Sequence, residues 1–114
     1  MTIDFRVITV QRGGLWFAHA ERTDNGNRFG IECSSESAEA AAARLTRWLD
    51  WQREHSSALE ALQQAQRAYH RTIASRAFAG PTEGAAAAEL QKESLERVET
   101  ARGKLDEVRA LRPE

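Results

Sequence analysis

The chain has 114 residues, of which 16 are basic and 17 acidic, so its formal net charge at pH 7 is -1. That balance excludes a general attraction to nucleic acid or to an anionic membrane, although a local basic patch stays compatible with it. The single cysteine excludes an internal disulfide framework and a cysteine-rich zinc site.

The N-terminal segment, MTIDFRVITV, contains Asp4 and has no long apolar core, so it does not resemble a signal peptide. No apolar run in the chain approaches the roughly 20 residues that a membrane-spanning helix needs. One unpaired thiol is typical of a reducing compartment. We therefore expect a cytoplasmic protein that has no membrane partner.

Three short segments near the N-terminus predict a three-stranded antiparallel β-meander. The segments are FRVITV at 5–10, LWFAHA at 15–20 and RFGIEC at 28–33. They are rich in β-branched and aromatic residues, which suit a pleated sheet. Gly13-Gly14 and Asn25-Gly26 lie between them and fit two-residue hairpin turns, which need positive φ at the turn positions.

The two turns also predict a register. The expected pairs are Thr9 with Ala18, Val7 with Ala20, Arg6 with Glu21, Ala20 with Ile31, and Ala18 with Cys33. One face of the sheet then collects apolar side chains and forms a core face. This core face contains Ile3, Phe5, Val7, Trp16, Ala18, Ala20, Phe29, Ile31 and Cys33. Its small residues lie in the middle, where a helix can pack closely.

The opposite face of the sheet, called the outer face below, carries polar pairs and an apolar group. Arg6 lies opposite Glu21, and His19 lies between Ile8 and Glu32. The apolar group around the first turn consists of Ile8, Val10, Leu15 and Phe17. Three interpretations stay open: the second helix or a loop covers this group, it forms a self-association or partner surface, or it lines a small-ligand pocket.

A long helix follows the sheet. Its candidate N-caps and first-turn acids are Ser34, Ser35, Ser37, Glu36 and Glu39. Neither proline nor glycine interrupts residues 37–79, a span of roughly 43 residues or about 64 Å. Because so long a helix cannot lie only on a three-stranded sheet, we expect its first turns to cap the sheet and the rest to form a coiled-coil arm.

Glycine and proline at 80–84 then predict a loop, and a second helix over about 85–112 folds back antiparallel to the first. The expected fold is therefore α+β: a three-stranded antiparallel meander, a long helix and a second antiparallel helix that completes a helical hairpin. We expect two domains, a β-β-β-α segment over 1–50 and a helical hairpin stalk over 51–114.

Each predicted helix carries a heptad seam, by which we mean the row of residues that faces the other helix. On the first helix the seam is Leu45, Trp48, Gln52, His55, Leu59, Leu62, Gln66, Tyr69 and Ile73. On the second helix it is Ser94, Val98, Ala101, Leu105 and Val108, flanked by Leu90, Leu95 and Leu111. An adjacent stripe on the first helix consists of Ala58, Ala61, Ala65 and Ala68.

Polar residues interrupt both seams, which makes them thin. Such seams suit a homodimer that forms a four-helix bundle better than an isolated hairpin. The polar seam positions then either set the register and oligomeric state or face solvent on a loosely packed arm.

No group of residues predicts catalysis or a metal site. His19 and Cys33 point to opposite faces of the sheet, and His55 and His70 are roughly 22 Å apart along one helix, so neither pair can share a metal. The serines of SSES are explained as N-caps, and the glycines of RGG and DNGN as hairpin turns. We expect no enzymatic activity, no catalytic residue, no cofactor and no metal.

Nucleic-acid binding is also not favoured. Arg44, Arg47 and Arg53 lie on one side of the first helix near Trp51, where they could contact phosphates. Acidic residues are interleaved throughout this helix, so the pattern favours a solvated face.

Residues 5–49, FRVITVQRGGLWFAHAERTDNGNRFGIECSSESAEAAAARLTRWL, resemble the β-β-β-α domain of HicB-type antitoxins. They share that family's order of a strand, a tight turn, an aromatic-containing strand, a third strand and a serine-capped acidic helix start. The resemblance implies a partial ribonuclease-H-like fold without nuclease activity that binds a small toxin protein. A helical hairpin stands where that family carries a DNA-binding module, and no functional residue is transferred from the family.

Two functions are therefore predicted. The first is a non-enzymatic interaction or scaffolding protein that self-associates through its helical seams and its outer face. The alternative is an antitoxin-like regulatory module that binds a partner protein, with DNA as a further ligand. The candidate interface consists of Ile8, Val10, Leu15, Phe17, Leu59, Leu62, Tyr69, Ile73, Val98, Leu105 and Val108.

Overall fold

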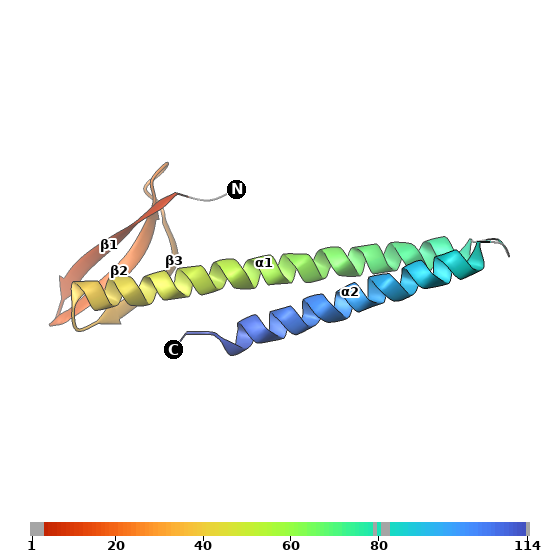
Figure 1. The fold of residues 1–114 in the computed structure, drawn as a ribbon. Coiled ribbons are helices and arrows are strands. Elements are labelled where there is room, and N and C mark those ends of the chain that lie inside the picture. The colour runs from red at the N-terminus through yellow and green to blue at the C-terminus, as the bar shows by residue number, and fades with distance from the viewer. Residues whose placement is uncertain (1–3, 79, 81–82, 114) are drawn as a thin grey trace. The chain divides into compact units, whose positions relative to one another are not determined.

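The computed structural model describes residues 4–78, 80 and 83–113, and five elements follow one another along this part of the chain (Figure 1). They are β1 (Phe5–Arg12), β2 (Leu15–Arg22), β3 (Arg28–Ser35), α1 (Ala38–Ala77) and α2 (Gly84–Ala110). The predicted α+β fold, an antiparallel meander followed by two long helices that pack together, is confirmed. Predictions at Ile3, Ala79, Pro81 and Thr82 lie outside the described residues.

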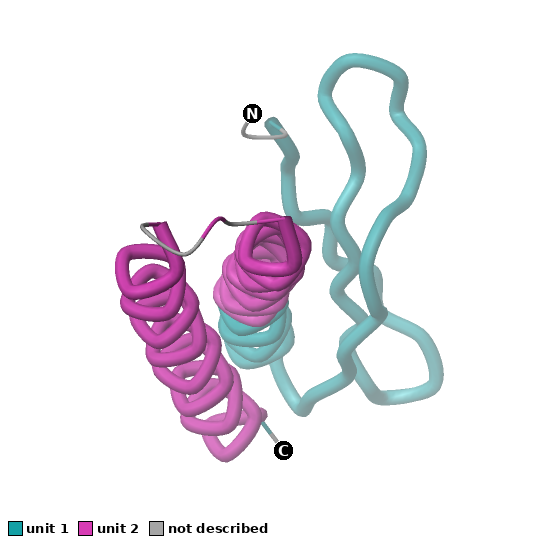
Figure 2. The backbone as a smooth tube through the Cα atoms, turned by 90° about the vertical axis from the view of Figure 1, so that its right-hand side faces the viewer, with its two compact units in different colours: residues 1–52, 113–114 teal, residues 53–112 magenta. Residues whose placement is uncertain are grey.

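The chain divides into two compact units, residues 1–52 with 113–114 and residues 53–112 (Figure 2). We call them the sheet unit and the hairpin unit. The sheet unit contains the three strands and the first turns of α1, and the hairpin unit contains the rest of α1 together with α2. In the described part of the chain, neither helix combines the length and the apolarity that crossing a membrane requires.

The first β-hairpin has the predicted two-residue turn. Gly13 and Gly14 both have positive φ, 57° and 83°, a conformation that glycine adopts without steric cost. Pairing is continuous along the eight residues of each strand. It includes the three predicted pairs, which are Thr9 with Ala18, Val7 with Ala20, and Arg6 with Glu21. The register of β1 against β2 is therefore confirmed.

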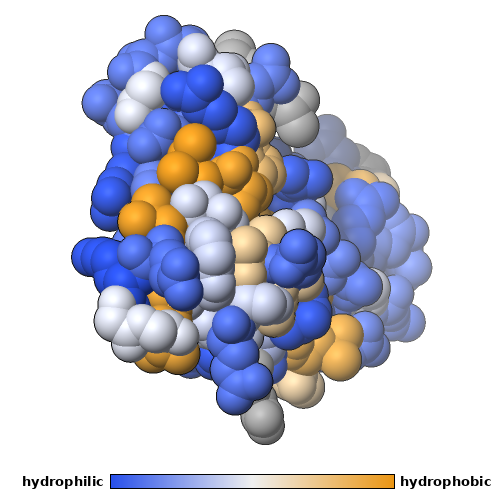
Figure 3. All heavy atoms as spheres, turned by 90° about the vertical axis from the view of Figure 1, so that its left-hand side faces the viewer, coloured by the Kyte–Doolittle hydropathy of each residue, from blue (hydrophilic) through white to orange (hydrophobic). Residues whose placement is uncertain are grey.

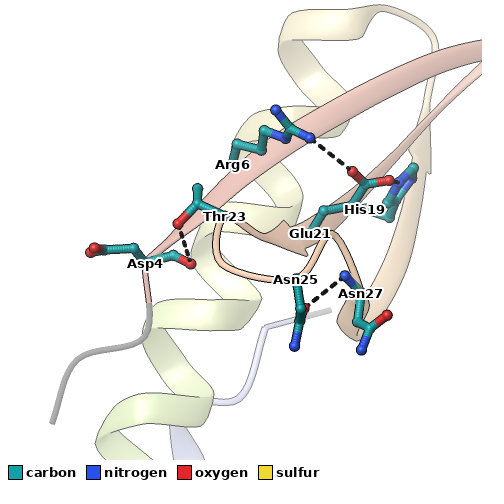
Figure 4. Close-up of polar contacts among 7 residues, drawn as sticks. All are labelled: Asp4, Arg6, His19, Glu21, Thr23, Asn25 and Asn27. Carbon is teal, nitrogen blue, oxygen red and sulfur yellow. Dashed lines mark hydrogen bonds and ion pairs between the residues drawn. The ribbon is translucent and has the colours of Figure 1, made fainter.

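The second β-hairpin differs from the prediction at its turn (Figure 4). The amide of Arg22 donates to the carbonyl of Asn27, and the amide of Gly26 donates to the carbonyl of Arg22, each at 2.9 Å. Arg22 and Asn27 therefore close a four-residue turn over 23–26, and the predicted two-residue turn at Asn25-Gly26 is wrong. The side-chain oxygen of Asn25 accepts the amide of Asn27 at 2.9 Å, a local contact that stabilises this longer loop.

A bulge in β3 restores the predicted register beyond the turn. Ala20 lies opposite Phe29, whereas Ala18 lies opposite Cys33, so residues 30–32 face a single residue of β2. The longer turn and the bulge each displace the register by two residues, in opposite senses. Because side chains alternate with a period of two, the core face keeps its identity on both sides of the bulge.

The bulge also moves one residue out of the predicted core face. Ile31 was expected opposite Ala20, and that expectation is wrong: it lies in the bulge and is 37% exposed. Gly30 has a φ of 74°, and a Cβ at this position would lie 3.0 Å from Cδ2 of Leu49. The bulge therefore depends on glycine both for its backbone conformation and for the close approach of α1.

The start of α1 packs on the core face. Of the three candidate N-caps, Ser37 is the one used: its hydroxyl accepts the amide of Ala40 at 3.1 Å. Ala18, Ala20 and Ala41 are 0% exposed, because their small side chains let the helix approach the sheet closely. The core consists of Ala18, Ala20, Cys33, Ala41, Leu45 and Leu49, bordered by half-buried Phe5, Val7, Trp16, Phe29 and Trp48. Leu45 and Trp48, expected on the helical seam, belong to this core instead.

In the hairpin unit α2 runs antiparallel to α1 (Figure 1). The guanidinium of Arg76 donates to Oε1 of Gln91 at 2.8 Å. The buried residues of α2 are Ser94, Val98, Leu105 and Val108. They occupy four of the five predicted seam positions, and the fifth, Ala101, is half-buried.

The row that α1 buries in the hairpin unit differs from its predicted seam. The buried and half-buried residues of this row are Ala58, Leu62, Ala65, Tyr69 and Thr72. The prediction placed Ile73 in this seam and is wrong there, because Ile73 is 43% exposed. Small side chains allow two helices to approach closely, so Ala58 and Ala65 of the alanine stripe lie in this row and the larger Leu59 and Ile73 lie at its border.

Candidate interaction surface

The outer face of the sheet carries the predicted apolar group. Val10 and Leu15 are 42% and 43% exposed, and Ile8 and Phe17 are half-buried. Figure 3 shows one face of the molecule, on which orange, apolar residues gather among blue, hydrophilic ones. Strand pairing explains this arrangement, because Val10 lies directly opposite Phe17 and Ile8 lies opposite His19.

Charged side chains border this apolar group. The guanidinium carbon of Arg12 lies 4.4 Å from the centre of the Phe17 ring, in a cation–π arrangement. The same guanidinium donates to Oε1 of Glu32 at 3.1 Å, and Arg28 lies 3.5 Å from the other oxygen of Glu32. An apolar patch with an ion-paired border is the usual composition of a protein–protein contact.

His19 lies on the outer face, as predicted, and is buried there. Its side chain donates from Nε2 to Oε1 of Glu21 at 3.0 Å, and Arg6 lies 3.7 Å from Oε2 of the same carboxylate (Figure 4). The hydrogen bond from His19, together with the charges of Arg6 and Arg28, lowers the pKa of Glu21 below its ordinary value. A buried polar ring needs a hydrogen-bond partner, so the contact between His19 and Glu21 has a structural role: it stabilises the sheet.

The single cysteine lies in the core of the sheet unit. Cys33 is 5% exposed, and burial raises the pKa of its thiol, against the opposing influence of Arg44 and Arg47. A thiol of this kind is a poor nucleophile, because the thiolate is the reactive form. Among the described residues, no group of three or more histidines, cysteines or acidic residues is placed to hold a metal ion.

The remaining candidate interface residues lie in the hairpin unit and differ in burial. Leu62, Val98, Leu105 and Val108 are buried, so they stabilise the hairpin of a single chain. Ile73, by contrast, is 43% exposed. Leu90 and Leu95, which flank the row on α2, are 55% and 40% exposed, and Leu59 and Tyr69 are half-buried.

A shallow groove follows the alanines between α1 and α2. It consists of two hollows of about 470 and 650 Å³ that share Ala61 and Lys104. Ala58, Ala65, Ala101 and Val108 add to its apolar floor, and we call it the alanine groove. Its border carries both signs of charge, with Arg53, Glu54, Glu93, Glu96, Arg97 and Lys104.

Sequence reasoning missed the inward position of Ala58 and Thr72. Both residues fit a heptad with Leu62, Ala65 and Tyr69, so their spacing alone could have identified them. The prediction gave more weight to large apolar side chains than to that spacing.

Comparisons with models of protein families, with curated proteins and with solved structures find no match for this chain. The function must therefore be argued from the surfaces described above. The likeness of residues 5–49 to HicB-type antitoxins stays a prediction.

Proposed function

We propose that this protein is a non-enzymatic interaction protein that self-associates as a homodimer. The observation that carries the proposal is the exposure of large apolar side chains in both units. Val10 and Leu15 are 42% and 43% exposed in the sheet unit, and Leu95 and Ile73 are 40% and 43% exposed in the hairpin unit. Apolar groups of this kind with charged borders mark contacts with another protein.

The packing within each unit supports the same proposal. Alanines supply much of the core of the sheet unit, and the buried row of the hairpin unit includes Thr72 and Ser94. Short side chains bury little apolar area, and each Å² removed from water contributes only about 25 cal/mol. A second copy supplies further apolar area without any change in the fold of either unit.

Two surfaces could make the contact between copies. Two hairpin units in a four-helix bundle would cover the alanine groove, since small residues let helices approach closely. Two sheet units would instead cover Val10 and Leu15 of the outer face. Both arrangements give a homodimer, and variants that affect only one surface distinguish them.

The test of the proposal is the solution mass, measured by light scattering over a hundredfold range of concentration. We expect twice the chain mass of 12.8 kDa, with dissociation at the dilute end of the range. A mass of 12.8 kDa at every concentration would contradict self-association.

An antitoxin-like regulatory module is the second candidate function. The β-β-β-α order of the sheet unit, with an exposed apolar outer face, favours it. This function requires a different protein on the outer face, with DNA as a further ligand. Its test is an electrophoretic shift of DNA, which must weaken steeply as the salt concentration rises if phosphates are contacted. The absence of any shift at low salt would exclude the DNA-binding part of this alternative.

A further inference from the structure

The two outer strands of the sheet expose their peptide groups differently. The strand order is β1-β2-β3, so β1 and β3 are the edges. The amide of Thr23 donates to the carbonyl of Asp4 at 3.1 Å, which continues the β1–β2 register by one hydrogen-bonded pair. In an antiparallel ladder, hydrogen-bonded and non-hydrogen-bonded pairs alternate.

That alternation determines which peptide groups face away from β2. From Asp4 onwards, the residues whose peptide groups face β2 are Arg6, Ile8, Val10 and Arg12. The residues whose peptide groups face the open edge are Phe5, Val7, Thr9 and Gln11. A row of donors and acceptors at the edge of a sheet is a template for another strand.

β3 has the features that usually prevent such pairing, and β1 does not. The bulge and the positive φ of Gly30 interrupt β3. β1 pairs with β2 without a register shift over eight residues and contains no proline. Its central residues, VITV at 7–10, are β-branched and uncharged. The β1 edge is therefore the one on which a further strand can pair.

We propose that β1 pairs antiparallel with β1 of a second copy of this chain, which joins two sheets into one of six strands. The inference rests on the proposed self-association and assigns it to the sheet unit. The hydrogen-bonded pairs would join Val7 to Thr9 of the second copy and Phe5 to Gln11 of the second copy, each twice about the two-fold axis.

The charged residues of β1 favour a second copy of β1 as the partner, and they favour one register of pairing. The alternation of the open edge permits a two-fold axis at any residue of β1, and the axes that pair the longest stretch of the strand pass through Ile8 or Thr9. An axis at Thr9 places Arg6 directly opposite Arg12 of the second copy, and like charges in this position are destabilising. An axis at Ile8 instead places Asp4 opposite Arg12 of the second copy, twice, and β1 is in this sense complementary to itself.

The pairing also covers part of the apolar group on the outer face. With the axis at Ile8, the two Ile8 side chains meet as a non-hydrogen-bonded pair, in which side chains lie closest together. Val10 comes to lie against the aliphatic stem of Arg6 of the second copy. The outer faces of the two sheets thus become one continuous surface, with Leu15 and Phe17 next to the joined strands.

Disulfide formation tests the register. In a chain that carries Cys33→Ala, Ile8→Cys should cross-link two copies under mild oxidation, because the paired Cα atoms are about 4.5 Å apart. Thr9→Cys is the control, because its two cysteines would face each other only if the axis passed through Thr9. In the proposed register they are diagonal neighbours at roughly 7–8 Å, which is too far for a disulfide. In Val10→Cys the two cysteines are offset by roughly 13 Å along the strands.

Backbone blocking tests the edge itself. Thr9→Pro removes an amide that faces the open edge and leaves the hydrogen bonds to β2 in place, so the fold tolerates it. We expect a dimer-to-monomer change in mass for Thr9→Pro and no change for Thr9→Ala, with unchanged circular dichroism in both. Gln11→Pro removes the next outward-facing amide and replaces Thr9→Pro if that variant fails to fold.

The outcomes separate the inference from the proposed function. Cross-linking at Ile8 alone, with loss of the dimer in the proline variant, supports both. A dimer that survives Thr9→Pro and Gln11→Pro and does not cross-link at Ile8 overturns the edge pairing but leaves self-association intact, through the alanine groove or through face-to-face contact of the outer faces. A wild-type monomer at all concentrations overturns both.

Discussion

Gly30 lies where β3 and α1 approach each other closely. Its φ of 74° favours glycine, and a Cβ would lie 3.0 Å from Leu49, a side chain that is 7% exposed. Gly26 has a similar φ of 71°, but nothing lies within 4 Å of its Cβ position. The two glycines thus share one backbone requirement and differ in their surroundings.

Gly30→Ala should therefore destabilise the protein more than Gly26→Ala. The left-handed backbone costs about 1–2 kcal/mol in either variant. At Gly30 the displacement of Leu49 adds to that cost, because packed cores resist even one extra methyl group. Thermal unfolding measures both, and equal melting temperatures would show that Leu49 yields without cost.

Glu21 predicts a specific dependence of stability on pH. Its pKa in the folded protein lies below the ordinary value of 4.5, first because of the hydrogen bond from His19. Between the two pKa values the unfolded chain binds more protons, so stability falls as the pH falls through this interval. The stabilisation is complete above about pH 4.5 and is lost once the pH drops below the folded pKa.

Glu21→Gln should remove this part of the acid dependence, since an amide accepts the same hydrogen bond but does not titrate in this range. Urea unfolding at a series of pH values below about 4.5 should show a shallower slope than for the wild type. Glu60→Gln makes the same chemical change on the exposed surface of α1, outside the alanine groove, and controls for net charge. An unaltered slope for Glu21→Gln would mean that the contact with His19 does not persist in solution.

At the level of the elements, the stability of the helical hairpin depends on a few large buried side chains. Leu105 is 3% exposed, whereas Leu90 on the same helix is 55% exposed. Leu105→Ala should lower the free energy of unfolding by about 2–5 kcal/mol, because it removes buried methylenes and leaves a cavity. Leu90→Ala, the matched control, should change it by about 0.5 kcal/mol or less. A similar loss in both would show that another chain covers Leu90.

The elements were predictable because periodicity is a strong signal over long segments. Alternation identified all three strands, and the absence of glycine and proline identified α1 almost to its ends, at Ala38 and Ala77 instead of 37 and 79. The turn at residues 23–26 was not predictable from Asn25-Gly26, because loop length depends on the bulge at Gly30 that offsets it. The longer turn and the bulge shift the register in opposite senses, so together they do not change which residues of β3 alternate as apolar and polar.

The candidate surface was predictable only in part, for a related reason. Alternation placed Val10 and Leu15 on the outer face, since both are large and lie beside a turn of known geometry. The inward position of Ala58 on α1 was not predicted, because an alanine adds little to an apolar pattern even where it allows the closest helix contact. The burial of His19 was not predicted, because it depends on the hydrogen bond to Glu21, and that contact depends on how the two side chains lie in the folded sheet.

For the whole molecule, self-association has a consequence for stability that does not depend on which surface makes the contact. When a folded dimer unfolds to separate chains, the equilibrium depends on concentration by mass action. A hundredfold increase in concentration favours the folded dimer by about 2.7 kcal/mol, which corresponds to several degrees in melting temperature for a domain of this size.

The melting temperature of the wild type should therefore rise with concentration. Thr9→Pro supplies the matched control: if β1 pairs with β1 of a second copy, its melting temperature should be independent of concentration over the same range. Differential scanning calorimetry at three or more concentrations measures both chains. A concentration-dependent melting temperature that persists in Thr9→Pro would exclude the β1 edge as the contact and leave the alanine groove or the outer face, because the substitution reaches neither surface.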